Sequence, residues 1–225
     1  MEYGLKHAAE RKAFEAAVSA AMRKADKSGS EGYVEMVNVI QKVLGDAWPE
    51  HAYDNLREAL GKDGKWTGYF NNLLKNTDRE YLKGLLMSFG FEGGFTGFHR
   101  TRKLGQELGI KIPWIILFDP TSACNLHCTG CWASEYSHQL NLSWEDMDRI
   151  VTEGKELGIH AYVMTGGEPM VRKRDIVRLA RKHSDCGFML FTNGTLVDQQ
   201  FCDDMRSCKN IVLSMSIGGD RKSVV

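Results

Sequence analysis

The spacing of hydrophobic residues along the chain changes near residue 112. Before that point, apolar residues recur at helical intervals, as Val34, Val37 and Leu44 do within residues 31–44, and this spacing predicts amphipathic helices. Glycine-bearing stretches such as GKDGK and FGFEGG separate the periodic segments. We therefore expect an all-helical N-terminal domain over residues 1–111, with helices near residues 5–26, 31–44, 49–60, 66–75, 78–89 and 95–108.

From residue 112 onward, short apolar runs alternate with helical patterns. The runs have the length and flanking turn residues of buried strands, and they lie at residues 114–118, 161–165, 187–192 and 210–217. The first helical pattern between them has Ser143 as a candidate N-cap, with Asp146 three residues later. This alternation predicts an α/β fold with a parallel sheet, and a second domain over residues 112–225 with about four βα units.

Unusual residues follow the end of each predicted strand. Three cysteines follow the first strand, GGEP (166–169) follows the second, and NGT (193–195) follows the third. Ser214 and Ser216 lie within the fourth. Because parallel strands end at one edge of a sheet, these groups are expected at the same edge, where α/β proteins bind ligands.

The cysteines Cys124, Cys128 and Cys131 are spaced to surround one inorganic centre. A cubane iron–sulfur cluster normally takes four thiolates, so three would leave one iron open to a further ligand. A zinc site in a non-catalytic scaffold or binding protein is an alternative, with His127 as the fourth ligand. The Cys-x2-Cys pair could also be a thioredoxin-like redox motif.

The combined motifs resemble the radical S-adenosylmethionine (radical SAM) superfamily. They are CxxxCxxC, an aromatic residue directly after the third cysteine (Trp132), GGEP after the next strand and TNG after the third, and the resemblance covers residues 112–225. It implies a TIM-like (β/α) barrel of usually six units, so we expect a truncated partial barrel whose C-terminal units are missing. It also implies a [4Fe-4S] cluster that reductively cleaves S-adenosylmethionine to a 5′-deoxyadenosyl radical, which abstracts hydrogen from a substrate.

The resemblance also implies residue roles at the cluster and at the methionine end of S-adenosylmethionine. The three cysteines would ligate the cluster and, with Glu168, form the catalytic set. Gly166 and Gly167 would let the backbone approach the methionine. Glu168 would accept a hydrogen bond from its ammonium, Pro169 would fix the turn, and Trp132 would lie near the adenine.

Further contacts are implied near the ribose. Thr192 and Asn193 would lie beside it, and Gly194 would give clearance. Ser214 and Ser216 are candidates for ribose or carboxylate contacts, or are small residues that fill the barrel. A catalytically dead barrel that binds the cluster but does not cleave S-adenosylmethionine is a further alternative.

Charge and composition limit the partners. The net charge of zero gives no electrostatic case for binding nucleic acid, and no apolar run is long enough to span a membrane. The N-terminus has no signal-peptide pattern, so a cytoplasmic location is expected. The implied partners are S-adenosylmethionine, a reducing electron donor of the flavodoxin or ferredoxin type, and a peptide, protein or cofactor-precursor substrate. The helical half could cover the bottom of the barrel, bind a substrate protein or mediate dimerisation.

Overall fold

The computed structural model describes residues 4–28, 30–44, 48–62, 64–131, 133 and 139–217. The chain divides into two compact units, Met1–Met87 and Ser88–Val225. Among the described residues, no helix is both long enough and apolar enough to cross a membrane.

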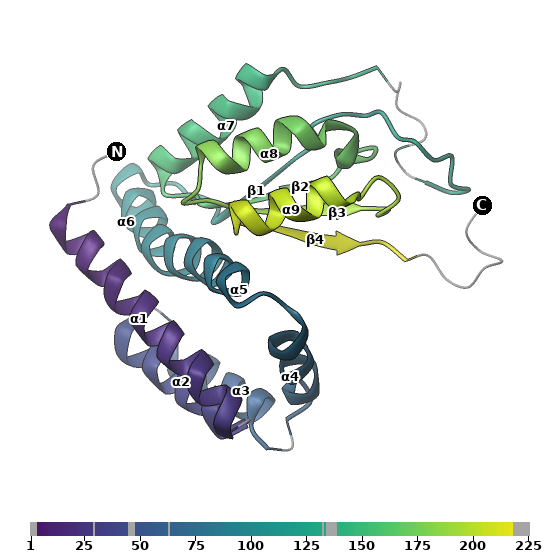
Figure 1. The fold of residues 1–225 in the computed structure, drawn as a ribbon. Helices are drawn as coiled ribbons and strands as arrows, with labels where there is room; N and C mark the ends of the chain where they lie inside the picture. Colours follow the sequence, from purple (N-terminus) through teal and green to yellow (C-terminus); the bar gives the residue numbers. More distant parts are fainter. Residues whose placement is uncertain are drawn as a thin grey trace. The chain divides into compact units, whose positions relative to one another are not determined.

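The first unit is helical (Figure 1). A small core joins its helices, with Tyr33, Val37 and Tyr53 at most 2% exposed, and the Tyr33 hydroxyl donates to Asn71 Oδ1 at 2.7 Å. This buried hydroxyl therefore has a partner, which avoids the cost of an unsatisfied polar group. The helices are α1 (Leu5–Ser28), α2 (Ser30–Leu44), α3 (Glu50–Leu60), α4 (Thr67–Asn76) and α5 (Arg79–Leu85).

The expected break at FGFEGG is wrong, because the chain stays helical through it. Residues Leu86–Gly97 form the π-helix η2, which continues into α6 (Phe98–Leu108). Phe91 of η2 is fully buried, and a methyl group on Gly187 would lie 2.6 Å from the ring of Phe89. Tertiary packing thus outweighs the low helix propensity of the glycines.

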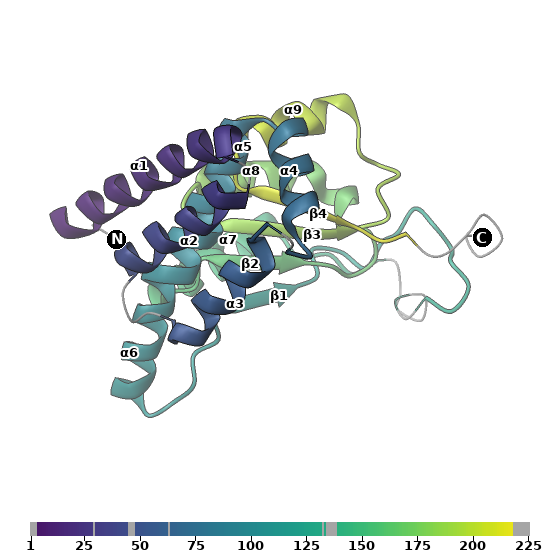
Figure 2. The same ribbon diagram turned by 90° about the horizontal axis from the view of Figure 1, so that it is seen from below.

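The second unit contains a parallel sheet in the order β1-β2-β3-β4 (Figure 2). Its strands are β1 (Ile115–Phe118), β2 (Ala161–Met164), β3 (Gly187–Thr192) and β4 (Ile211–Met215). The α/β class, with four parallel strands after an all-helical region, is confirmed.

Three helices cover one face of this sheet: α7 (Trp144–Leu157), α8 (Lys173–Lys182) and α9 (Gln199–Cys208) (Figure 1). Met147, Ile176 and Phe201 pack from these helices onto Tyr162 and Phe188 of the sheet. Each large side chain buried this way contributes about 1.5–3 kcal/mol relative to exposure. The capping prediction for α7 is confirmed, since the Asp146 backbone N–H donates to Ser143 Oγ at 3.0 Å.

Candidate functional site

The cysteine-bearing segment is a loop that is closed at its base. Thr121 and Asn141 form an isolated antiparallel bridge, and the Thr121 hydroxyl donates to Asn141 Oδ1 at 2.6 Å. Next to this bridge, the Ser122 backbone N–H donates to the carbonyl of Leu140 at 2.8 Å. The three cysteines therefore lie on a loop whose two ends are held together.

Arg172 holds the same base from the side. It follows the GGEP motif, at the end of the short 3-10 helix η4 (Pro169–Arg172). Its Nη1 donates to the carbonyls of Leu142 at 2.9 Å and Pro120 at 3.4 Å, while Nε donates to Asp175. The loops after β1 and β2 are thus joined by one guanidinium group.

The three cysteines on the loop are accessible to a ligand. Cys124 and Cys131 are half-buried, Cys128 is exposed, and all six cysteines of the chain are thiols rather than disulfides. The Leu126 backbone N–H donates to Cys124 Sγ at 3.4 Å, which orients this side chain on the loop. Trp132 lies outside the described residues, so its expected position near an adenine stays a prediction.

The donor atoms on this loop are too far apart for one zinc ion as they stand. Four ligands at about 2.3 Å from a tetrahedral ion lie roughly 3.8 Å from one another. Among the described residues, no three ligand atoms of Cys124, His127, Cys128 and Cys131 lie within 4.8 Å of one another. A cubane places its thiolates on separate irons, hence farther apart than the ligands of a single ion.

The two glycines of GGEP pack against the start of the cysteine loop. Gly166 has φ +101°, and a methyl group on it would lie 2.6 Å from the carbonyl oxygen of Thr121. A methyl group on Gly167 would lie 2.4 Å from the carbonyl oxygen of Ala123. The same oxygen accepts a hydrogen bond from the Glu168 backbone N–H at 2.8 Å. No larger residue fits either position, because the two backbones touch.

Glu168 is the buried centre of the site. It is 1% exposed, and Oε1 accepts from the Met170 backbone at 2.9 Å and from the Thr192 hydroxyl at 2.6 Å. Oε2 accepts from the Asn193 backbone at 2.8 Å. The carboxylate therefore ties the loop after β2 to the loop after β3. Its contact with a ligand ammonium stays a prediction, and Pro169 starts η4 directly after it.

Asn193 joins the cysteine loop to the loop after β3. Its Nδ2 donates to Asn125 Oδ1 at 3.1 Å, and its Oδ1 accepts from the Thr195 backbone and hydroxyl at 2.9 and 2.6 Å. Asn125 Nδ2 donates in turn to Thr195 Oγ1 at 2.8 Å. These three side chains form a closed triangle beside Cys124.

The two serines of the fourth strand are not part of this network. Ser214 is half-buried opposite Phe191, and Ser216 is exposed one residue beyond β4. The Ser216 backbone N–H donates to the carbonyl of Thr192 at 2.9 Å, but among the described residues neither serine hydroxyl makes a hydrogen bond. Gly194, at φ +76°, forms the turn after Asn193.

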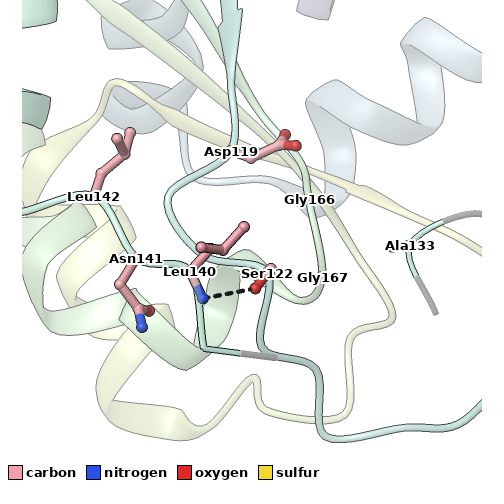
Figure 3. Close-up of a pocket in the computed structure, with 8 residues that line it drawn as sticks. All are labelled: Asp119, Ser122, Ala133, Leu140, Asn141, Leu142, Gly166 and Gly167. Carbon is pink, nitrogen blue, oxygen red and sulfur yellow. Dashed lines mark hydrogen bonds between the residues drawn. The ribbon is translucent and has the colours of Figure 1, made fainter. Parts of the chain in front are cut away.

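A cavity of about 500 Å³ lies between the cysteine loop and the glycine loop (Figure 3). Partial desolvation raises the pKa of Asp119, the residue directly after β1. The cavity is lined by Asp119, Ser122, Ala133, Leu140, Asn141, Leu142, Gly166 and Gly167.

Sequence reasoning missed four residues that the structure places here. Asn125 and Thr195 are adjacent to residues that were predicted, and Asp119 directly follows a predicted strand. Their position beside the motifs was the available signal. Arg172 had no such signal, because it lies in a basic helical stretch typical of a solvated face.

A second group of donor atoms lies at the opposite, amino-terminal end of the sheet. His160, Asp185 and Cys186 place one ligand atom each within 4.8 Å of the others. Burial raises the pKa of Cys186 and lowers that of His160. Lys155 Nζ lies 2.8 Å from the Asp185 carboxylate, where its charge would oppose a bound cation.

Comparison with known proteins gives relatives that match somewhat less than half of the chain. Over 111 residues it is 31% identical to an AdoMet-dependent heme synthase of Methanosarcina barkeri, covering 48% of this chain and 32% of the relative. Over 108 residues it is 38% identical to a GTP 3′,8-cyclase of Geobacter sulfurreducens, covering 45% and 33%. The chain thus spans about a third of the length of these relatives.

Among solved structures, the chain is similar to Streptococcus suis SuiB bound to S-adenosylmethionine, with a TM-score of 0.44 and 17% identity over 75% of this chain and 41% of that one. A likeness at that level carries no argument about chemistry. The family model of the Radical SAM superfamily matches residues 118–221, the segment that contains the cysteine, glycine and TNG loops. Residues 118–221 of this chain therefore belong to the Radical SAM superfamily.

Proposed function

We propose that this chain carries the cofactor-binding part of a radical SAM enzyme. Family membership implies a [4Fe-4S] cluster and S-adenosylmethionine. When bound and reduced, the cluster supplies the electron that cleaves S-adenosylmethionine into methionine and a 5′-deoxyadenosyl radical, which removes hydrogen from a substrate. One observation carries the proposal: hydrogen bonds join the loops after β1, β2 and β3, and the first of these loops bears accessible thiols.

In this proposal, the side chains of the chain have three tasks. Cys124, Cys128 and Cys131 hold the cluster, and the closed base of their loop fixes where it lies. Glu168 and Asn193 hold the loops after β2 and β3 against the cysteine loop. Positioning of this kind lowers the barrier because the reacting atoms are already in place.

Contacts to S-adenosylmethionine follow from the same arrangement and are proposals. The backbone of Gly166 and Gly167 would meet the methionine, and Thr192, Asn193 and Gly194 would border the ribose with Ser214 and Ser216. Trp132 would border the adenine. The thiols require a reducing compartment such as the cytoplasm and an electron donor of the flavodoxin or ferredoxin type.

The substrate is proposed only as a class. The relatives are named for heme synthesis and GTP cyclisation, so a cofactor precursor is one candidate substrate. A peptide is the other candidate, and it rests on the resemblance of the sequence motifs alone. Residues 1–111 are proposed as a helical N-terminal domain, of which Met1–Met87 form a compact unit of their own.

Anaerobic reconstitution with iron and sulfide tests the proposal. We expect about four irons and four sulfides per chain, and 5′-deoxyadenosine after addition of dithionite and S-adenosylmethionine. One zinc per chain without sulfide would instead favour the scaffold alternative. A cluster without any 5′-deoxyadenosine would favour the catalytically dead barrel.

A further inference from the structure

Among the described residues, one polar side chain that lines the 500 Å³ cavity has no hydrogen-bond or ion-pair partner. Ser122 Oγ accepts from the Leu140 backbone at 3.0 Å, and both ends of the Asn141 amide are hydrogen-bonded, to Thr121 and to Gln139. Asp119 differs, because among the described residues its carboxylate makes no hydrogen bond and no ion pair. Its carboxylate oxygens are therefore available to a ligand that enters the cavity.

The surroundings of Asp119 indicate which ligand atoms it can meet. A methyl group on Gly166 would lie 2.9 Å from Asp119 Cβ, so the glycine keeps this side of the carboxyl group accessible (Figure 3). Leu140, Leu142 and Ala133 give the rest of the cavity an apolar lining. Neighbouring atoms desolvate the carboxyl group and raise its pKa, and no cation among the described residues offsets that effect.

Two carboxylates lie beside the glycine loop, and they differ in availability. Glu168 is 1% exposed and already accepts three hydrogen bonds from the protein. Asp119 is exposed and accepts none from the described residues. A ligand that brings a positive charge into the cavity would therefore meet Asp119.

We propose that the Asp119 carboxylate binds the ammonium group of a ligand whose uncharged part occupies the cavity between the cysteine and glycine loops. The assignment of the cavity to a reacting molecule rests on the proposed function. The ammonium has two sources, the methionine end of S-adenosylmethionine or an amine of the substrate. Both present the same chemistry, a primary ammonium that forms a charge-assisted hydrogen bond.

The experiment compares the wild-type chain with Asp119→Asn, which keeps the shape and removes the charge. Asp203→Asn is the matched control, because Asp203 pairs with Arg206 on α9 and does not line the cavity. Equilibrium dialysis of the reconstituted chains measures affinity for S-adenosylmethionine and for its analogue with hydrogen in place of the ammonium. Ligand-observed NMR measures butylammonium against 1-butanol on the metal-free form of each chain, with folding checked by circular dichroism.

Loss of one partly exposed ion pair should weaken ammonium binding about fivefold. If Asp119→Asn weakens S-adenosylmethionine binding but not that of the analogue, the ammonium comes from S-adenosylmethionine. If only the preference for butylammonium over butanol disappears, it comes from the substrate. If neither changes, or if Asp203→Asn has the same effect, the proposal is wrong. The butylammonium arm needs no cluster, so failure to bind iron would count against the proposed function alone.

Discussion

Cysteines lie near other polar side chains at both ends of the parallel sheet, but their exposure differs between the two ends. At the carboxyl end, Cys124, Cys128 and Cys131 are at least partly exposed on a closed loop. At the amino end, Cys186 is fully buried beside His160 and Asp185. Donor atoms lie closer together at the amino end, yet there burial keeps the thiol protonated and Lys155 pairs with the carboxylate. A candidate binding site therefore differs from a packed polar cluster in the exposure of its thiols and in having charged groups without a protein partner. Short distances between donor atoms do not make that distinction alone.

The largest expected effect is the loss of iron when a cysteine at the carboxyl end of the sheet is replaced. Cys128→Ala should reduce iron from about four per chain to nearly none, because a cubane with two protein thiolates is poorly held. Since Cys128 is exposed, the metal-free chain should keep its free energy of unfolding within about 0.5 kcal/mol. Iron assay and urea denaturation measure the two quantities.

Cys186→Ala, which replaces the buried cysteine at the amino end of the sheet, is the control for Cys128→Ala. It should leave the iron content unchanged and lower the free energy of unfolding by roughly 1–2 kcal/mol, because it opens a small cavity in the core. Equal iron loss in both variants would contradict the distinction between the two ends.

The next effect concerns Glu168 itself. Glu168→Gln should lower the free energy of unfolding of the metal-free chain by about 2–3 kcal/mol, because an amide N–H₂ would then face a backbone or hydroxyl donor in a buried place. The measurement is urea denaturation without metal. Asp198→Asn, which also removes a carboxylate that binds a backbone N–H but lies at a more exposed helix start, should cost less. A cost for Glu168→Gln no larger than that of the control would show that the buried network is not what joins the loops.

A smaller effect is expected for the side-chain triangle beside Cys124. Asn125→Ala removes two hydrogen bonds at an exposed position, so it should cost only about 1 kcal/mol of stability. Its clearer effect should be faster loss of iron to a chelator, because the cysteine loop is less firmly held. Asn76→Ala removes exposed amide bonds within α4 and should leave the chelation rate unchanged. If the wild type and Asn125→Ala lose iron to the chelator at the same rate, Asn125 does not help to hold the cysteine loop.

The smallest effects are opposite in sign at the two ends and depend on pH. Burial is the largest single influence on Asp185 and opposes its ionisation, but the hydrogen bond from Lys155, the nearby positive charge and smaller contributions together outweigh burial and lower the pKa. Asp185 therefore adds stability above its unfolded pKa of about 4, and this is lost as pH falls through the lowered folded value. Desolvation raises the pKa of Asp119, so its ionised form subtracts stability at neutral pH and that penalty disappears on acidification.

These signs give a matched pair of variants. At pH 7, Asp185→Asn should lower the free energy of unfolding and Asp119→Asn should raise it slightly, and both differences should shrink near pH 3. Urea denaturation at the two pH values measures them. Destabilisation by both variants at pH 7 would contradict the assignment of Asp119 as an unpaired carboxylate.

Much of the fold could be predicted from local pattern, since strands predicted at residues 114–118 and 187–192 are found at Ile115–Phe118 and Gly187–Thr192. The edge at which the motifs meet was also predictable, because parallel strands end together. The continuous helix through FGFEGG was not, since it depends on contacts between Phe89 and a strand about a hundred residues away. The same holds for the protein contacts of Glu168 and for the role of Arg172, which are set by tertiary hydrogen bonds that leave no periodic signal.

The central claim is that three thiolates hold a cubane with one iron left for S-adenosylmethionine. Low-temperature electron paramagnetic resonance of the reconstituted, dithionite-reduced chain, recorded with and without S-adenosylmethionine, tests it most directly. The account predicts the signal of a reduced [4Fe-4S] cluster whose shape changes when S-adenosylmethionine is added. A chain with no such signal, or a signal that S-adenosylmethionine leaves unchanged, would contradict it.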